Sequence, residues 1–130
     1  MAFDGTWTLA HNENYLKLLE SMGLDAEKRQ LAAYDHMKLK IKQNGKQISV
    51  HESSDYSAVD IVFGQKFKHS LYDEIELVGE WKLKGDIIEG NFTRKDNKKV
   101  LKTQLEIVGG ELVQTLSYEG VKAKRIFVRE

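Results

Sequence analysis

Turn residues divide most of this chain into short segments, and this punctuation limits the folds that the chain can adopt. Turn signals recur roughly every ten positions, at Asn44 and Gly45, Gly64, Asp73 and Glu74, Gly85 and Asp86, Asp96 and Asn97, Gly109 and Gly110, and Glu119 and Gly120. The strongest signal is Asn44 with Gly45, because both residues tolerate the positive φ of a type I′ turn. Short segments joined by tight turns pair antiparallel with their neighbours, so the pattern predicts an antiparallel barrel or sandwich.

The segments between these turns alternate with the period of a strand that buries one face. Over residues 75–83 the apolar side chains share one face and the charged ones share the other: Ile75, Leu77, Trp81 and Leu83 against Glu76, Glu80 and Lys82. Residues 101–107 repeat the pattern, with Leu101, Thr103, Leu105 and Ile107 against Lys102, Gln104 and Glu106. We therefore expect one face of each strand to form the core and the other to face water.

Residues 12–34 have the spacing of two short helices instead. In the first, apolar side chains recur at helical intervals before Gly23 ends the helix: Tyr15, Leu18, Leu19 and Met22. Asn12 or Asn14 can cap this helix, and Asp25 can cap the second. We expect helices over 14–22 and 25–34, inserted between the first and second strands. Two helices are too few to form a layer, so we interpret them as a lid on a barrel opening, although the same spacing suits an ordinary packed helix.

One cation is predicted inside the fold. Alternation places Val121, Ala123, Arg125 and Phe127 on one side of the last strand, and Lys122, Lys124, Ile126 and Val128 on the other. The lysine side must face water, which leaves Arg125 on the dry side. A guanidinium cannot lose its proton, so a buried Arg125 needs an internal carboxylate, ordered water or the polar head of a ligand. In the alternative interpretation Ile126 and Val128 face the core and Arg125 faces solvent.

Composition excludes several classes of function. The chain has 130 residues, which suits one domain over 1–130, and it has no cysteine, which excludes disulfides and thiolate chemistry. Its 20 basic and 20 acidic residues balance, so nothing favours a nucleic-acid partner. The four histidines do not have metal-ligand spacing, and neither a nucleophile elbow nor a phosphate-binding glycine loop occurs. Because these motifs are missing, we expect that the protein is not an enzyme and has no cofactor or metal. Because a secretory signal and a long apolar run are also missing, we expect a soluble cytosolic protein.

Several motifs spread over the whole chain resemble the intracellular lipid-binding protein family, most closely its intestinal type. They are M-A-F-D-G-T-W at the start, E-N-Y at 13–15, M-G at 22–23, K-R-Q-L-A-A at 28–33, E-S-S at 52–54 and E-L-V-Q-T-L-S-Y-E-G-V-K-A-K-R-I-F at 111–127. The resemblance implies an all-β fold: a ten-stranded antiparallel up-and-down β-barrel, or β-clam, of the lipocalin-like kind, with a helix-turn-helix lid. It also implies a monomeric carrier whose ligand, a long-chain fatty acid or related lipid, lies inside the barrel.

The resemblance assigns ligand-binding roles to particular positions. Arg125 and Phe127 match the Arg-x-Tyr/Phe element of the last strand, and Gln114 matches an interior glutamine. Apolar cavity positions are matched by Phe63, Leu71, Leu77, Trp81, Phe92 and Leu101, and portal positions by Tyr15, Leu18 and Leu31. The lid carries Lys28 and Arg29, so the resemblance also implies transient contact with a membrane surface, although such charges are commonly only a solvated face.

Three positions depart from the family pattern. Leu105 stands where the intestinal type has a second, deeper inward arginine, Leu116 replaces an interior tyrosine, and His69 replaces an aromatic that lines the cavity. A single cation at Arg125 can still hold a carboxylate. A less polar interior also makes neutral ligands more competitive, so the alternative is a carrier of a retinoid, a bile acid or another weakly polar lipid. Gln104 lies beside Leu105, but alternation directs it outward.

Overall fold

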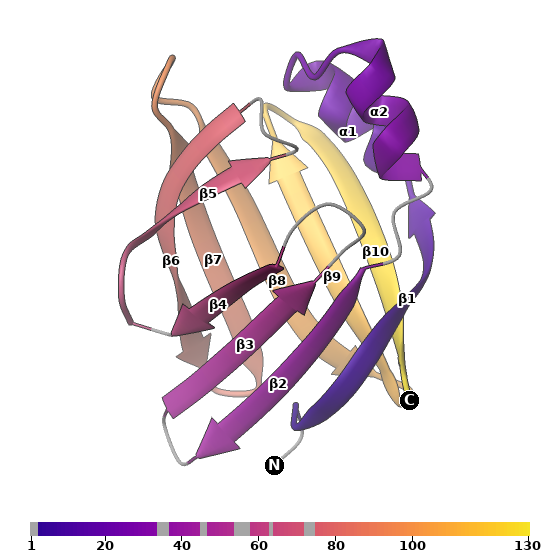
Figure 1. Ribbon diagram of the computed structural model, residues 1–130, viewed down its shortest axis with the longest axis vertical. Coiled ribbons are helices and arrows are strands. Elements are labelled where there is room, and N and C mark those ends of the chain that lie inside the picture. Colours follow the sequence, from indigo (N-terminus) through magenta and orange to yellow (C-terminus); the bar gives the residue numbers. More distant parts are fainter. Residues whose placement is uncertain (1–2, 34–36, 45–46, 54–57, 63, 72–74) are drawn as a thin grey trace.

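In the part of the chain that the structure describes, ten antiparallel strands form one curved sheet, with a pair of helices inserted after the first strand (Figure 1). The computed structural model describes residues 3–33, 37–44, 47–53, 58–62, 64–71 and 75–130. The strands are β1 (Gly5–Glu13), β2 (Lys38–Asn44), β3 (Gln47–Ser53), β4 (Ala58–Val62), β5 (Phe67–Leu71), β6 (Ile75–Lys84), β7 (Ile87–Arg94), β8 (Val100–Val108), β9 (Glu111–Tyr118) and β10 (Val121–Arg129). The helices are α1 (Tyr15–Ser21) and α2 (Ala26–Ala33).

The strand order is that of an up-and-down barrel. Hydrogen-bonded neighbours run β4-β3-β2-β1-β10-β9-β8-β7-β6-β5, so almost every strand pairs with the next along the chain. Pairing of β1 with β10 joins the first and last strands. The predicted ten-stranded antiparallel β-clam with a helical pair between the first two strands is therefore confirmed.

Tight hairpins connect the strands at the positions predicted in the second half of the chain. Gly109 and Gly110 have φ of 59° and 84°, and Glu119 and Gly120 have φ of 48° and 82°. Two successive residues with positive φ are the mark of the type I′ turn, whose twist matches that of the flanking strands. The turns predicted at Gly45 and at Asp73 and Glu74 lie outside the described residues.

The observed burial in β6 and β10 follows the alternation predicted from the sequence, with one exception in β10. In β6 the inward side chains of Ile75, Leu77 and Trp81 are buried, while Glu76 and Lys82 are exposed. The exception is Ile126 in β10, which is buried although it shares the outer side with Lys122, Lys124 and the exposed Val128. Ile126 pairs with His11, next to the register shift between Leu9 and His11 in β1, while Arg125 and Phe127 on either side of it are also buried.

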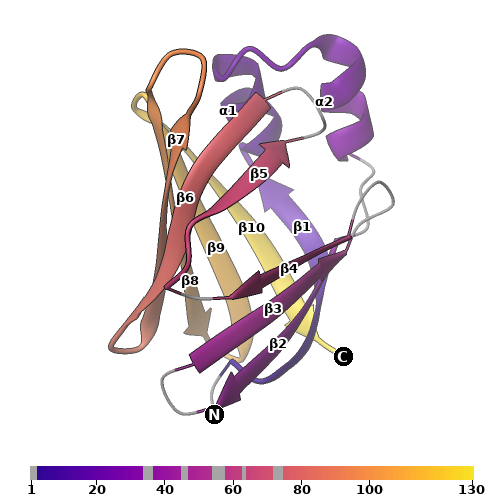
Figure 2. The same ribbon diagram turned by 60° about the vertical axis from the view of Figure 1, so that its left-hand side comes forward.

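The two helices cover one end of the barrel, opposite the end where both termini lie (Figures 1 and 2). Helix α1 packs against β10 and β9, and α2 packs mainly against α1. The apolar face predicted for α1 is buried, and it consists of Tyr15, Leu18, Leu19 and Met22. No described helix has the length and apolar character needed to cross a bilayer.

Two of the three helix-end features predicted from the sequence are observed. Gly23 ends α1 with φ of 87°, and Asp25 caps α2 by accepting a hydrogen bond from the Lys28 N–H at 3.0 Å. The side-chain cap predicted for α1 is wrong. Asn14 occupies the cap position, but its left-handed backbone turns the amide away, and Nδ2 donates to the carbonyl of Lys122 at 2.7 Å. Asn12 instead contacts Arg125.

Candidate functional site

Strand register arranges the inward side chains in rows that cross the sheet. In one row Arg125 lies opposite Gln114, Gln114 opposite Leu105, and Leu105 opposite Ile88. The next row towards the helices consists of Ala123, Leu116, Thr103, Gly90 and Trp81. The first row is polar on β9 and β10 and apolar on β7 and β8, so the interior has a polar side and an apolar side.

An aromatic pair dominates the apolar side. The rings of Trp81 and Phe92 meet edge to face, with centroids 5.5 Å apart and planes at 70°. Gly90 makes this packing possible, because a Cβ there would lie 2.9 Å from Cε3 of Trp81 and 2.7 Å from Cε2 of Phe92. Leu77 and Leu101 are also buried. The arrangement presents an apolar surface on β6 and β7 that extends to Leu101 of β8.

Arg125 is buried, as predicted, with 2% of its surface exposed. Its Nε donates to Oδ1 of Asn12 at 2.9 Å, and its Nη1 lies 3.4 Å from the hydroxyl of Tyr15. The guanidinium carbon lies 4.1 Å from the centroid of the Tyr15 ring, which adds a cation–π contact with α1. Nη1 also lies 3.5 Å from Sδ of Met37.

The partners of Arg125 leave its charge without a counter-ion. Both oxygen acceptors are neutral, and in the described part of the chain no carboxylate forms an ion pair with it. Nη2 is buried and has no hydrogen-bond partner among the described residues. A buried donor that the fold does not satisfy is costly, so this nitrogen marks a place where an anion or another acceptor can bind.

Next to Arg125, a polar group of the first row contacts a polar group of the second. Gln114 donates through Nε2 to Oγ1 of Thr103 at 3.1 Å. Leu105 and Leu116 are buried beside them, with 3% and 7% of their surfaces exposed, and Gln104 is exposed as predicted. The site therefore combines one cation, an amide and a hydroxyl with a surrounding apolar surface.

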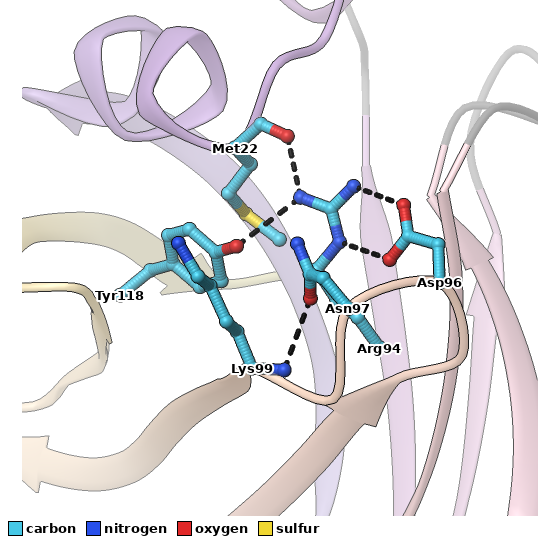
Figure 3. Close-up of polar contacts among 6 residues, drawn as sticks. All are labelled: Met22, Arg94, Asp96, Asn97, Lys99 and Tyr118. Carbon is cyan, nitrogen blue, oxygen red and sulfur yellow. Dashed lines mark hydrogen bonds and ion pairs between the residues drawn. The ribbon is translucent and has the colours of Figure 1, made fainter.

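Arg94, at the end of β7, is a second buried cation that we did not predict (Figure 3). It forms a bidentate pair with Asp96, with Nε to Oδ1 at 3.0 Å and Nη2 to Oδ2 at 2.7 Å. Its Nη1 donates to the carbonyl of Met22 at 2.5 Å and to the hydroxyl of Tyr118 at 3.2 Å. Alternation contained the signal, because Arg94 follows the inward Phe92 by two positions.

The pair with Asp96 shifts both pKa values. Hydrogen bonding to Asp96 raises the pKa of Arg94, and hydrogen bonding from Arg94 lowers the pKa of Asp96. Each shift favours the charged form, so this ion pair persists at neutral pH.

The remaining predicted site residues divide into two groups. Tyr15, Leu18, Leu77, Trp81, Phe92, Leu101 and Phe127 are buried on the inner face or under α1. Leu31 lies in α2, and His69 and Leu71 lie in β5, but their side chains lie outside the description, and Phe63 lies outside the described residues altogether. Within the described ranges, no group of three His, Asp or Glu residues could hold a metal ion.

Known proteins resemble this chain over its full length. No protein-family model matches it. The chain is 52% identical to "Fatty acid-binding protein, intestinal" of Bos taurus and 48% identical to that of Homo sapiens, with 100% of each chain covered. "Cellular retinoic acid-binding protein 1" of Gallus gallus is 29% identical over 98% of each chain.

Solved structures share the fold. A Schistosoma mansoni fatty acid binding protein in complex with arachidonic acid superposes with a TM-score of 0.85 at 17% identity, covering 99% of this chain and 96% of that one. Echinococcus granulosus fatty-acid-binding protein 1 gives 0.83 at 22% identity, covering 98% and 97%. At 17% and 22% identity these structures establish the fold alone. The family is established by the full-length relatives, which are 52% and 48% identical. The chain therefore belongs to the family of intestinal fatty acid-binding proteins.

Proposed function

We propose that this protein is a non-enzymatic carrier that binds a long-chain fatty acid inside its barrel and transports or buffers it in the cytosol. Full-length relatives named as intestinal fatty acid-binding proteins support this function. The single structural observation that carries it is Arg125, a buried cation with an unpaired nitrogen and no carboxylate partner among the described residues. A bound carboxylate supplies the missing counter-ion.

The rows of inward side chains give the ligand an orientation. The carboxylate lies against Arg125 on β10, beside Gln114, where a charge-assisted hydrogen bond gains strength from the low dielectric. The hydrocarbon tail lies against the apolar wall around Trp81 and Phe92. The proposed ligand-binding residues are Tyr15, Leu18, Leu31, Phe63, His69, Leu71, Leu77, Trp81, Phe92, Leu101, Leu105, Gln114, Leu116, Arg125 and Phe127.

One observation favours a second candidate, a carrier of a retinoid, a bile acid or another weakly polar lipid. Leu105 and Leu116 are both buried next to the polar groups of the interior. They do not offer a charge or hydrogen bond, so a neutral head group is not penalised there. Of the described interior side chains near this site, Arg125 is the cation that can select an acid.

We further propose that the chain acts as a monomer of one domain, and that its lid touches membranes transiently. Of the two lid cations, Arg29 donates to the carbonyl of Leu24 at 2.5 Å, and Lys28 is half-buried. One guanidinium nitrogen of Arg29 is thus used in a hydrogen bond within the lid. Transfer of fatty acid to vesicles tests the contact: a rate that rises with vesicle concentration supports it, and a rate independent of that concentration contradicts it.

The ligand can be identified directly. Native mass spectrometry of the purified protein is expected to show a complex heavier than the protein by the mass of one fatty acid. Lipid extraction then identifies that fatty acid. A retinoid or neutral lipid in its place would favour the second candidate. A protein that carries no lipid and does not bind added oleate would contradict both.

Intrinsic fluorescence locates the ligand. Trp81 lies on the apolar wall, while Trp7 lies at the opposite end, where its Nε1 donates to the carbonyl of Phe3. Oleate is expected to change the emission of the wild type and of Trp7→Phe, but not that of Trp81→Phe. Loss of the change in Trp7→Phe instead would mean that the ligand lies near Trp7, at the end of the barrel away from the helices.

A further inference from the structure

We propose that Arg94 is a positioning residue that latches the C-terminal end of α1 to the barrel and sets the rate at which ligand enters and leaves. We define the Arg94 latch as Arg94, Asp96, Tyr118 and the carbonyl of Met22. The inference rests on the proposed function only in requiring that a ligand passes the helical end of the barrel.

The end of α1 presents a carbonyl that its own turn does not satisfy. Gly23 N–H donates to the carbonyl of Glu20 and Leu24 N–H to that of Leu19, which is the Schellman pattern. These bonds leave the carbonyl of Met22 without a helical partner, at the negative end of the helix dipole. Arg94 Nη1 donates to this carbonyl at 2.5 Å, so the partner is a cation from a strand 72 positions away.

Arg94 is itself held rigidly by the turn that follows β7 (Figure 3). Asp96 accepts hydrogen bonds from two of the guanidinium nitrogens of Arg94. The backbone N–H of Arg94 donates to the carbonyl of Lys99 at 2.8 Å. Asn97 stabilises the same turn by accepting a hydrogen bond from the Lys99 N–H at 3.0 Å. All three guanidinium nitrogens have partners, so Arg94 is not placed to bind a ligand head group.

The two ends of α1 are held by different strands. At its start, Asn14 donates to the carbonyl of Lys122 in β10, and Tyr15 contacts Arg125. At its finish, the Arg94 latch ties the helix to β7 and, through Tyr118, to β9. Helix α2 begins only three residues after Gly23 and packs mainly against α1, so the latch also restrains the first turn of α2.

A latch that contacts the lid but not the ligand changes exchange rates without changing affinity. Opening the end of the barrel requires the bonds of the Met22 carbonyl to break, and their loss speeds entry and exit by the same factor. The dissociation constant is the ratio of these rates and stays constant. A residue that held the lid for stability alone would leave both rates unchanged.

The test compares Arg94→Met with Arg129→Met. The guanidinium carbon of Arg129 lies 4.2 Å from the centroid of the Trp7 ring, and the side chain donates to the carbonyl of Asp4. Both contacts lie at the end of the barrel away from the helices. With cis-parinaric acid as a fluorescent fatty-acid probe in stopped flow, Arg94→Met is expected to release probe about 10-fold faster, with a dissociation constant within about 2-fold of the wild type. Arg129→Met is expected to match the wild type. A release rate unchanged in Arg94→Met, or a dissociation constant that rises with it, would overturn the proposal.

Hydrogen exchange gives a readout that needs no ligand. The amides of Gly23 and Leu24 are expected to exchange faster in Arg94→Met, while those of β9 and β10 stay protected. If Arg94→Met does not fold, Tyr118→Phe and Asp96→Asn are expected to raise the release rate about 2-fold each, and unchanged rates in both would overturn the latch. A wild type that does not bind the probe would contradict the proposed function, while faster exchange at Leu24 would still support the latch.

Discussion

The two buried arginines of this barrel have the same chemistry and opposite surroundings. Both occupy inward positions on strands, and both contact α1 and a tyrosine. Arg94 has a carboxylate, Asp96, and a partner for every guanidinium nitrogen. Arg125 has an amide, a hydroxyl and one buried nitrogen that lacks a partner within the described ranges of the chain. A charge that the fold neutralises serves structure, whereas a charge that the fold leaves unneutralised is available to a ligand.

The physical cost of the two sites differs accordingly. An uncompensated buried charge costs several kcal/mol, while a paired and fully hydrogen-bonded one is close to neutral. The ring of Tyr15 recovers part of this cost for Arg125, since a cation over an aromatic face gains about 1 to 2 kcal/mol when it is desolvated. The apo protein therefore retains a local strain at Arg125 that binding an acid relieves.

The largest effect is expected from removing each charge in turn. Arg94→Met leaves the carbonyl of Met22 and the hydroxyl of Tyr118 without their donor and should lower the free energy of unfolding by about 3 kcal/mol. Arg125→Met removes an unneutralised charge and should stay within about 1 kcal/mol of the wild type. Urea unfolding of the apo protein measures both. Equal losses would mean that the two arginines are both structural.

A second substitution makes the difference larger. Leu105→Arg adds a cation to the row that contains Arg125, two strands away, and should destabilise the apo protein by about 2 kcal/mol through desolvation and repulsion. The same variant should favour oleate over oleyl alcohol more strongly than the wild type does. Titration calorimetry with both ligands measures this preference, and an unchanged ratio would place the head group away from Leu105.

A smaller effect is expected at acid pH, and only at Arg94. The lowered pKa of Asp96 means that its contribution to stability is complete above the pKa of the unfolded chain, near 4, and is lost as pH falls through the lower folded value. The stability difference between wild type and Asp96→Asn should therefore be constant above about pH 5 and shrink below about pH 4. The difference between wild type and Arg125→Gln should not change in that window. If the stability difference between wild type and Arg125→Gln did change in that window, Arg125 would have a carboxylate partner.

The sequence predicted one of these arginines and not the other, for reasons that can be stated. Arg125 lies in the middle of a clear alternation with lysines opposite, so its inward direction could be read from the strand alone. Arg94 follows Phe92 with the same parity, but it is the last residue of β7, and the polar run Lys95–Asn97 after it is typical of a solvated turn. One of its partners, the carbonyl of Met22, lies 72 positions away, and local patterns do not predict contacts so far apart in the chain.

Elsewhere, local patterns succeeded where short-range physics decides the structure. The type I′ turns, the Gly23 helix end and the Asp25 cap depend on neighbouring residues, and all were predictable. Asn12 and Asn14 were expected at a helix cap, but both side chains bind the neighbouring strand β10, because tertiary partners outcompeted the local one. Ile126 is buried together with Arg125, a combination that simple alternation along β10 does not predict.

The most direct test of the account compares a fatty acid with its alcohol in Arg125→Gln. Titration calorimetry should show oleate bound about 5- to 150-fold more weakly than by the wild type, which corresponds to about 1 to 3 kcal/mol for an unmade charge-assisted hydrogen bond. Oleyl alcohol, which has the same chain and no charge, should change by less than about 3-fold. An equal loss for acid and alcohol, or no loss for the acid, would contradict the claim that the charge left unneutralised by the fold holds the ligand.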